Sequence, residues 1–438
     1  MLTYQQTLDF LYRLEIERMD LKLERVAEAL RLCGAPERRF PSIHIAGTNG
    51  KGSTAAFLHS LLSTAGYQVG LFTSPHLVDF CERIRLGSVW ITEQEVIDGV
   101  ATIRAQVEPA GIRLTPFEMM TVLAFCAFAR AGVDIAVVEV GLGGRLDATN
   151  VLLPLVSVIT SIGLDHQAYL GATVADIARE KGGIIKPGVP VVIGQSDPES
   201  ESILSTLAQD RSSASYTLGQ DFFVQVDDDE KVDYRGIHKQ ITNLRLGLRG
   251  RFQSHNAALA LAALELIQPS YLLSEEQIRQ GLRTTRWPGR LDLVSERPLV
   301  ILDGAHNPQA LETLIAELPA VIQGKRMKLL FAVMRDKDWR TMIPLLATLA
   351  DEVVVTRVQQ ARAEDPTVLQ AAFAPFCPVR VVEDARTACR QLLETAGPDE
   401  AVVVTGSLFL VGEVYPLFAP TVQTRTIDPR EIDEGKRT

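Results

Sequence analysis

The stretch Ser42-Ile-His-Ile-Ala-Gly-Thr-Asn-Gly-Lys-Gly-Ser-Thr54 passes from a short apolar segment through a glycine-rich turn into a helix-forming segment. Glycines let backbone N–H groups converge on phosphate oxygens, and the N-terminus of the next helix adds partial positive charge. Lys51 can reach the β and γ phosphates of a nucleotide, and the Ser53 hydroxyl can bind Mg²⁺. The stretch therefore predicts a strand, a phosphate-binding turn at 47–52 and a helix over 53–65.

This turn departs from the common phosphate-loop pattern G-x-x-x-x-G-K-[ST] at two positions. Ala46 stands where the first glycine would be, and Gly52 separates Lys51 from Ser53. The alternative is a glycine-rich turn that only joins a strand to a helix. Because lysine, hydroxyl and glycines coincide in a strand-to-helix context, phosphate binding is favoured. The turn indicates a nucleoside triphosphate, and other motifs must define the reaction.

The segments around the turn predict a parallel α/β sheet. Strands are expected at 42–46, 69–72, 135–140 and 156–160. The last two are near-continuous β-branched runs, which are typical of parallel strands buried on both faces. Helices are expected at 7–33, 53–65, 117–131 and 256–267. Alternating apolar and polar residues at 221–248, punctuated by glycines, predict a small antiparallel β patch.

Residues 287–290 (Trp-Pro-Gly-Arg) interrupt this pattern and form the predicted linker. Strands then alternate with helices again, at 299–302, 329–333, 352–356 and 401–404. The predicted fold class is therefore α/β. A first domain over 1–290 contains the phosphate-loop parallel sheet and the β patch, and a smaller Rossmann-like α/β domain covers 295–438.

The composition limits the classes of partner. The chain has 438 residues, 46% hydrophobic, with a net charge of −10 at pH 7, which argues against nucleic acid and anionic membranes. Five scattered cysteines without a C-x-x-C pair argue against a disulfide framework or a structural zinc site. The N-terminus lacks a signal-peptide layout, and the longest apolar stretch, 151–164, is too short to span a bilayer. We expect a cytoplasmic protein, a monomer by default.

A magnesium site is predicted at the carboxyl ends of the strands, where α/β sheets place their ligands. Glu139 ends an apolar strand, and a buried carboxylate is costly unless it is paired or binds a metal. Ser53 and Glu139 suit Mg²⁺, which prefers oxygen ligands and retains waters; the alternative is a Glu139–Arg145 salt bridge. His166 follows the next strand and is a candidate for a second metal site. Lys181 would by default be a solvated helix residue.

Together these motifs resemble the folylpolyglutamate synthase/dihydrofolate synthase family of the Mur ligase superfamily. The shared segments cover most of the chain, in order: HIAGTNGKGST from His44, FTSPHL from Phe72, ERI from Glu82, TPFE from Thr115, EVGLGGRLDATN from Glu139, LDH from Leu164, EKGGIIKPG from Glu180, WPGRLD from Trp287, LDGAHNP from Leu302, RDKDW from Arg335 and GSLFLVGEV from Gly406.

The resemblance implies a ligase that uses ATP and two Mg²⁺ ions to join L-glutamate to dihydropteroate and to tetrahydrofolate through an acyl phosphate. The residues that it places at ATP are Gly50, Lys51, Gly52, Ser53, Asn256, Arg290, Asp303 and His306. Its metal ligands are Ser53, Glu139 and His166; its catalytic residues are Lys51, His166 and Lys181, the last being the lysine that the family carbamylates. The folate-side residues are Asp20, Leu21, Ser74, Arg83, Thr115, Pro116, Phe117, Glu118, Leu146, Asp147 and Ala148.

Two positions depart from the family pattern: Lys22 stands where the family often has glycine, and Gly182 where it often has alanine. Other residues keep a second interpretation. Without the resemblance, residues 115–118 are better explained as the N-cap and first turn of a helix, and Asp303 and His306 as turn-shaping residues. The alternative functions are a monofunctional folylpolyglutamate synthase, another Mur-type amino-acid ligase, and a nucleotide-binding regulatory protein.

Overall fold

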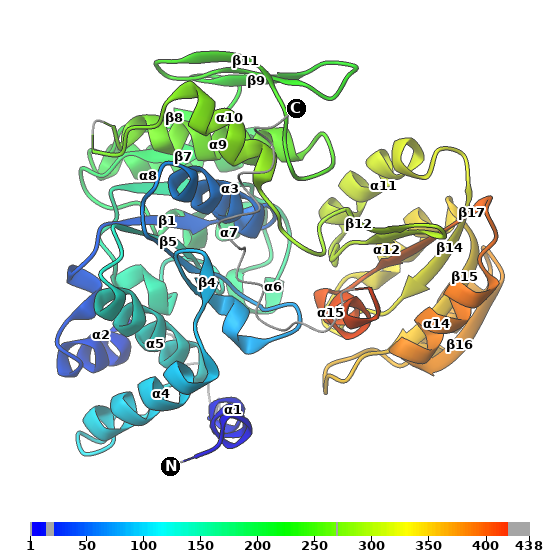
Figure 1. Ribbon diagram of the computed structural model, residues 1–438, viewed down its shortest axis with the longest axis horizontal. Helices are drawn as coiled ribbons and strands as arrows, with labels where there is room; N and C mark the ends of the chain where they lie inside the picture. Colours follow the sequence, from blue (N-terminus) through cyan, green and yellow to red (C-terminus); the bar gives the residue numbers. More distant parts are fainter. Residues whose placement is uncertain (1, 15–21, 269, 419–438) are drawn as a thin grey trace, which may run out of the picture. The chain divides into compact units, whose positions relative to one another are not determined.

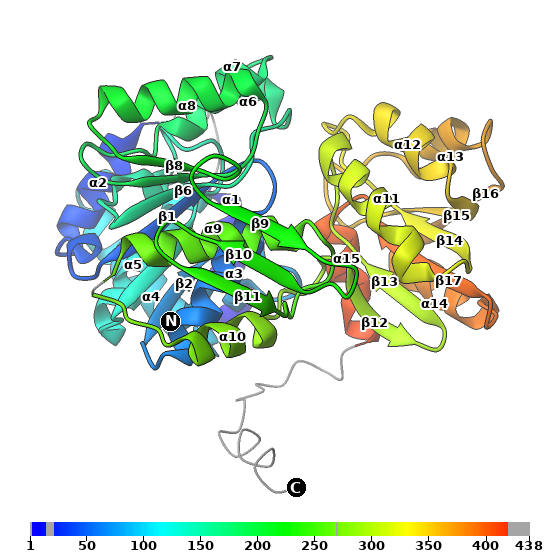
Figure 2. The same ribbon diagram turned by 90° about the horizontal axis from the view of Figure 1, so that it is seen from above.

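The computed structural model describes residues 2–14, 22–268 and 270–418, which separate into two units (Figures 1 and 2). The first unit contains the described residues up to 163 together with 167–247 and 253–285. The second contains 164–166, 248–252 and the chain from 286 onward. Among the described helices, none combines the length and the apolar character needed to cross a membrane.

The first unit is built on an eight-stranded sheet in the order β4-β3-β2-β5-β1-β6-β7-β8. The six strands β2, β5, β1, β6, β7 and β8 run parallel to one another, and β3 and β4 form an antiparallel edge. The strands are β1 Ser42–Ala46, β2 Val69–Phe72, β3 Ile84–Leu86, β4 Val89–Trp90, β5 Ile135–Glu139, β6 Val156–Ile159, β7 Val191–Ile193 and β8 Ser215–Thr217. Every residue of β1, β2, β5, β6 and β7 is buried, and for β5 and β6 the apolar runs at 135–140 and 156–160 predict this burial.

Helices cover both faces of this sheet. One face carries α3, α9 and α10, and the other carries α2, α4 and α5 over β2 and β5 and α7 and α8 over β6 to β8 (Figure 1). The helices are α1 Tyr4–Arg13, α2 Leu23–Leu32, α3 Lys51–Thr64, α4 Glu93–Val107, α5 Pro116–Ala131, α6 Gln167–Leu170, α7 Val174–Gly182, α8 Pro198–Asp210, α9 Gln253–Leu266 and α10 Glu275–Thr284, with 3₁₀ turns at η1 Pro36–Arg38, η2 Phe80–Arg83 and η3 Ala148–Val151.

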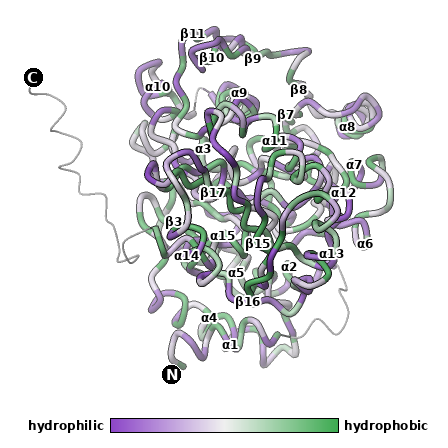
Figure 3. Tube along the Cα trace, turned by 90° about the vertical axis from the view of Figure 1, so that its right-hand side faces the viewer, coloured by the Kyte–Doolittle hydropathy of each residue, from purple (hydrophilic) through white to green (hydrophobic). Residues whose placement is uncertain are grey.

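A separate three-stranded antiparallel sheet confirms the predicted β patch. It consists of β9 Phe223–Val226, β10 Val232–Arg235 and β11 Gln240–Leu244, and its trace is mostly hydrophilic (Figure 3). The buried carboxylate of Glu265 on α9 holds it, because it accepts hydrogen bonds from the Tyr234 hydroxyl at 2.6 Å and the His238 backbone at 2.6 Å.

The second unit is a six-stranded sheet in the order β12-β13-β17-β14-β15-β16, parallel except for β12. Helices α11 to α13 cover one face, and α14 and α15 cover the other. The strands are β12 Asp292–Glu296, β13 Leu299–Leu302, β14 Arg326–Phe331, β15 Ala350–Arg357, β16 Val379–Asp384 and β17 Glu400–Thr405. The helices are α11 Pro308–Ile322, α12 Trp339–Ala347, α13 Pro366–Phe373, α14 Ala385–Thr395 and α15 Leu408–Val414, followed by η4 Tyr415–Leu417.

Two sequence predictions need correction. The single helix expected over 7–33 is wrong, because Lys22 is extended (φ −130°, ψ 132°) and starts α2 as a separate helix. The segments 164–166, 248–252 and 286–290, which the first domain predicted over 1–290 includes, group with the second unit. Their contacts explain this: Asp165 bonds Lys337, and the Arg251 backbone donates to Glu317.

Candidate active site

The predicted phosphate loop lies between β1 and α3. Gly47 and Gly50 have backbone φ angles of 149° and 87°, which L-residues that carry a side chain rarely adopt. A Cβ at Gly47 would collide with the Thr160 hydroxyl, and a Cβ at Gly50 with the amide oxygen of Asn256. A helix leaves the N–H groups of its first turn without intrahelical acceptors. The first-turn N–H donors of α3 are therefore directed toward the loop, and the collisions described above require glycine at positions 47 and 50.

Hydroxyl groups hold the loop to the segment that follows β6. Asn49 O accepts hydrogen bonds from the hydroxyls of Thr160 (2.6 Å) and Ser161 (3.1 Å). The Thr48 hydroxyl donates to Gly163 O and accepts from Gly163 N, each at 3.0 Å. We refer to these five residues as the loop latch. No local sequence motif marks this latch, because it depends on the pairing of β6 with β1, which brings their carboxyl ends together.

Two lysines converge on the carbonyl of Gly47. Lys51 Nζ donates to Gly47 O at 3.0 Å and to Thr48 O at 3.1 Å. Lys181 Nζ, from the end of α7, donates to Gly47 O at 2.7 Å. The expectation of a solvated Lys181 is wrong, because the residue is only 4% exposed. The close packing of α7 on the sheet brings its last turn to the loop.

The proposed metal ligands of the first unit are buried at the carboxyl edge of the sheet. Ser53 lies in the first turn of α3, and Glu139 ends β5. Glu139 Oε2 accepts from the Ser74 backbone at 3.3 Å. The alternative of a Glu139–Arg145 salt bridge is wrong, because Arg145 pairs with Glu180 at 2.8 Å.

Arg83 is a buried cation in the 74–83 segment. Its Nε donates to His76 Nδ1 at 2.8 Å, and its guanidinium lies 5.9 Å from the Phe80 ring. Burial lowers the pKa of Arg83, while the charges of Glu82 and Glu139 among others act in the opposite direction. Burial also lowers the pKa of His76 to about 4. Glu82 shapes the segment by accepting from three consecutive backbone N–H groups, those of residues 77, 78 and 79.

Asp147 organises the loop after β5. Its carboxylate accepts from the backbone of Gly141 and Leu142, each at 2.9 Å, and from the Thr149 hydroxyl at 2.5 Å. Burial raises the pKa of Asp147, while these hydrogen bonds act in the opposite direction. His44 on β1 extends the chain of contacts, with its Nε2 2.8 Å from the Thr149 hydroxyl. Leu146 and Ala148 flank Asp147 and are positioned by this loop.

The segment 115–118 caps α5. Thr115 and Glu118 form a capping box, with Pro116 in the first turn. Glu118 also pairs with Arg25 of α2 at 2.8 Å. The structural interpretation of these residues is therefore confirmed, and their folate role stays a prediction. Phe117 lies against Phe72, with ring centroids 5.9 Å apart; Asp20 and Leu21 lie outside the described residues.

Asn256 reaches the loop from α9. Its Nδ2 donates to Gln253 Oε1 at 2.9 Å, and its Oδ1 lies beside Gly50. Both side chains are buried. Gln253, which orients this amide, was missed because a lone glutamine carries no motif signal of its own.

The remaining predicted nucleotide residues belong to the second unit. Asp303 shapes the turn after β13, accepting from Leu291 N at 2.7 Å and Ala305 N at 2.8 Å. Burial raises the pKa of Asp303, against the charge of Arg290. His306 Nδ1 lies 2.8 Å from Gly304 O in the same turn.

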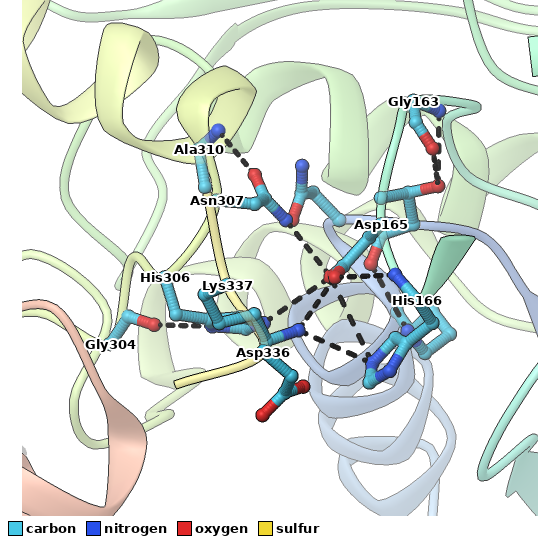
Figure 4. Close-up of polar contacts among 12 residues, drawn as sticks. Gly163, Asp165, His166, Gly304, His306, Asn307, Ala310, Asp336 and Lys337 are labelled. Atoms are coloured by element: carbon cyan, nitrogen blue, oxygen red, sulfur yellow. Dashed lines mark hydrogen bonds and ion pairs between the residues drawn. The ribbon is translucent and has the colours of Figure 1, made fainter. Parts of the chain in front are cut away.

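His166 also belongs to the second unit, beside the carboxylate of Asp165, for which the sequence predicts no role. The backbone of His166 has a positive φ of 51° and donates to Asp165 Oδ1 at 2.8 Å. Lys337 and His306 face the same carboxylate (Figure 4). Within the described ranges, no three His, Cys, Asp or Glu side chains cluster as a metal site.

The chain matches models of two families of ligase domains. Residues 45–264 match the Mur ligase middle domain, and residues 289–408 match the Mur ligase glutamate ligase domain. A dihydrofolate synthase/folylpolyglutamate synthase of Bacillus subtilis is 36% identical over 404 residues, covering 90% of this chain and 94% of the relative. One from Escherichia coli is 37% identical over 348 residues, 79% of each chain.

Solved structures agree with these matches. A Mycobacterium tuberculosis folylpolyglutamate synthase complexed with ADP superposes with a TM-score of 0.89 at 33% identity, covering 96% of this chain and 99% of the other. Escherichia coli FolC in complex with DHPP and ADP gives 0.88 at 33% identity, covering 95% and 97%.

Proposed function

The chain belongs to the dihydrofolate synthase/folylpolyglutamate synthase family of Mur ligases, and we propose on this basis that it is an ATP-dependent folate ligase. It joins L-glutamate to the carboxylate of dihydropteroate and to that of tetrahydrofolate through an acyl phosphate. Relatives named for both activities support the bifunctional form. The second candidate is a single folylpolyglutamate synthase activity, because a relative from Lacticaseibacillus casei, 33% identical, carries that name alone.

The observation that carries the proposal is the position of Lys51 in the glycine turn, where its Nζ donates to Gly47 O at 3.0 Å. The positive charge of Lys51 at this turn attracts an anion. The glycine turn and the N-terminus of α3 offer N–H donors at the same place. A triphosphate supplies such an anion. We propose that Asn256 and, in the second unit, Arg290, Asp303 and His306 also contact ATP.

The donor set fits magnesium. A serine hydroxyl and a carboxylate, from Ser53 and Glu139, are hard oxygen donors of the kind that Mg²⁺ takes beside phosphates and waters. His166 is the proposed ligand of a second ion, and a carbamate on buried Lys181 would bring carboxylate oxygens to the loop. When bound, Mg²⁺ neutralises phosphate charge and orients the transferred group. A relative from Yersinia pestis, solved with AMPPNP and a Mn ion, supports divalent metal use.

Different groups of the phosphate loop contribute to different parts of phosphoryl transfer. The N–H groups of residues 50–53 hold the phosphates in line, and Lys51 stabilises the charge on the γ-phosphoryl group as it moves to the substrate carboxylate. We propose that Arg83 attracts that carboxylate, because it is a buried cation whose charge interacts with that of Glu139. The amine of glutamate then attacks the acyl carbon, the amide forms, and phosphate leaves. The folate-side residues 115–118 and 146–148 are proposed to shape the pterin and benzoate subsite.

Phosphate release from Mg-ATP with L-glutamate tests the proposal, with dihydropteroate in one reaction and tetrahydrofolate in another. Turnover with both substrates is the expected result. Turnover with one substrate would assign a single activity. A chain that binds nucleotide but is silent with both would contradict the folate assignment and favour another Mur-type amino-acid ligase or a nucleotide-binding regulatory protein.

A further inference from the structure

The carboxylate of Asp165 gathers polar groups from several segments of the second unit (Figure 4). Lys337 Nζ lies 2.6 Å from Oδ1, Asn307 Nδ2 lies 3.2 Å from Oδ2, and His306 Nε2 lies 3.5 Å from Oδ2. The His166 backbone donates to Oδ1 at 2.8 Å. We refer to these residues as the Asp165 cluster. None of the roles expected from the sequence falls on Asp165, Asn307 or Lys337.

The cluster joins segments that are far apart in the chain. Asp165 lies in the 164–166 turn, and Lys337 lies just before α12. Asn307 is the N-cap of α11 and accepts from Ala310 N at 2.8 Å. The side chains of Asp165 and Lys337 are each only 8% exposed. A buried ion pair repays its desolvation only when its remaining hydrogen-bonding capacity is used, and Asn307 and His306 use that of Asp165.

The cluster also fixes the orientation of His306. One ring nitrogen faces Gly304 O at 2.8 Å, and the other faces Asp165. The Lys337 ammonium, 2.6 Å from Oδ1, pairs with the negative charge of Asp165 at the centre of the cluster.

We propose that Asp165 is a positioning residue for nucleotide binding, which holds the His306 ring and the Lys337 ammonium in place before the nucleotide arrives. The inference rests on the proposed function in one respect, namely that the ligand is ATP or ADP. Groups that are ordered in advance raise affinity because their ordering entropy is not lost on binding. Partners behind a metal-ligating side chain typically contribute roughly 10–100-fold, and we expect an effect of the same order behind His306.

The test compares nucleotide binding by the full chain and its variants with isothermal titration calorimetry, using MgADP and MgATP. Asp165→Asn keeps the shape and one acceptor oxygen but removes the charge, and Lys337→Met removes its partner. We expect each to weaken both nucleotides by about 10-fold or more, with KM for ATP changed more than kcat. The double variant should lose little beyond either single variant, since the two side chains act as one unit. Asp165→Glu, which restores the charge, should recover part of the affinity.

Asp336→Asn is the matched control. Asp336 precedes Lys337 and pairs with Arg362 at 3.0 Å, but its side chain is 42% exposed; its loss should leave nucleotide affinity unchanged. Parental affinity in both Asp165→Asn and Lys337→Met, with only a lower unfolding temperature, overturns the inference and leaves Asp165 a stabiliser of the fold. A parent chain that binds MgADP but ligates no glutamate contradicts the proposed function alone, and one that binds no nucleotide overturns both.

Discussion

Different forces hold the loop latch of the first unit and the Asp165 cluster of the second. The latch uses uncharged groups, such as the Thr160 hydroxyl 2.6 Å from Asn49 O. The cluster uses a buried ion pair, Asp165 with Lys337 at 2.6 Å. A neutral hydrogen bond contributes about 1 kcal/mol net, whereas breaking a buried ion pair on one side costs roughly 3–5 kcal/mol. The latch should therefore tolerate the loss of one bond, and the cluster should not tolerate the loss of one charge.

The largest expected effect that tests this comparison comes from Lys51, because its charged ammonium donates to backbone carbonyl groups. Its ammonium bonds Gly47 O and Thr48 O, and Lys181 also serves Gly47 O. Lys51→Met should therefore lower turnover by about 10²–10³-fold, the usual effect of removing a group that stabilises transition-state charge. The unfolding temperature should stay near that of the parent. Phosphate release and thermal unfolding measure the two effects.

Lys328→Met is the matched control for Lys51→Met. Lys328 is also buried, but it pairs with the carboxylate of Glu400 at 3.0 Å in the second unit. Its loss should lower the unfolding temperature and leave turnover per folded molecule unchanged. If Lys51→Met instead lost stability in proportion to its activity, Lys51 would be a structural residue and the loop would resemble the Asp165 cluster.

Gly50→Ala tests whether the phosphate loop is as sensitive to a change in its backbone as the Asp165 cluster is to the loss of a charge. Gly50 has φ 87°, and an alanine there costs about 1–2 kcal/mol for the left-handed backbone. The Cβ would also collide with the Asn256 amide oxygen, at a further cost of about 1 kcal/mol or more. We expect stability to fall by roughly 2–3 kcal/mol, and ATP affinity in calorimetric titrations to fall as well, because the displaced Asn256 amide disturbs the loop.

Gly66→Ala isolates the backbone part of that effect. Gly66 ends the same helix with φ 96°, and a Cβ there would have no heavy atom within 4 Å. It should lower stability by a similar backbone penalty while leaving ATP affinity intact. Equal losses of affinity in both variants would show that the loop is not the binding element.

How well the sequence predicts the phosphate loop and the Asp165 cluster depends on how their residues are distributed along the chain. Lysine, serine and glycines of the phosphate loop lie within one stretch of 13 residues, at 42–54, so local spacing carries the chemistry. Apolar runs predicted β1, β5 and β6 equally well. The strands β12 and β16 were missed, because they contain partly buried and exposed residues but no fully buried one, and their apolar pattern is weak.

The Asp165 cluster could not be predicted in this way. Asp165 is separated from Asn307 and Lys337 by 142 and 172 positions, and only the tertiary fold brings them together. Lys181 illustrates the same limit, since its helical context indicates solvent while the packing of α7 buries it. Capping at 115–118 was predicted because it depends on residues three positions apart.

Acid should lower the stability of the first unit through the buried histidine His59. His59 on α3 is 8% exposed, and burial, with the charge of Arg85, lowers its pKa to about 4. Below pH 6.5 the unfolded chain therefore binds a proton that the folded chain does not, so stability is lost as pH falls from 6.5 toward 4. The loss for His59 is about 2 kcal/mol between pH 6.5 and 5.

Urea unfolding at pH 7 and pH 5 measures this difference. His59→Gln retains a donor for Gly87 O, which lies 2.9 Å from Nε2, but it cannot take up a proton. The variant should lose less stability than the parent on acidification. An identical pH dependence in the two proteins would exclude His59 as a source of acid sensitivity.

The smallest expected effect comes from Thr160→Val, which removes one bond of the loop latch and keeps the side-chain shape. The Asn49 carbonyl would still accept from the Ser161 hydroxyl at 3.1 Å, so we expect about 1 kcal/mol, or roughly fivefold in ATP affinity. Thr356→Val makes the same change at a buried strand position of the second unit, where the hydroxyl donates to Glu383 O at 3.2 Å. Both should lower stability by a similar amount, but only Thr160→Val should weaken ATP. A loss of tenfold or more for Thr160→Val would mean that the neutral latch is as sensitive as the charged cluster, and the contrast between the two regions would then lie in how they are built and not in how they respond.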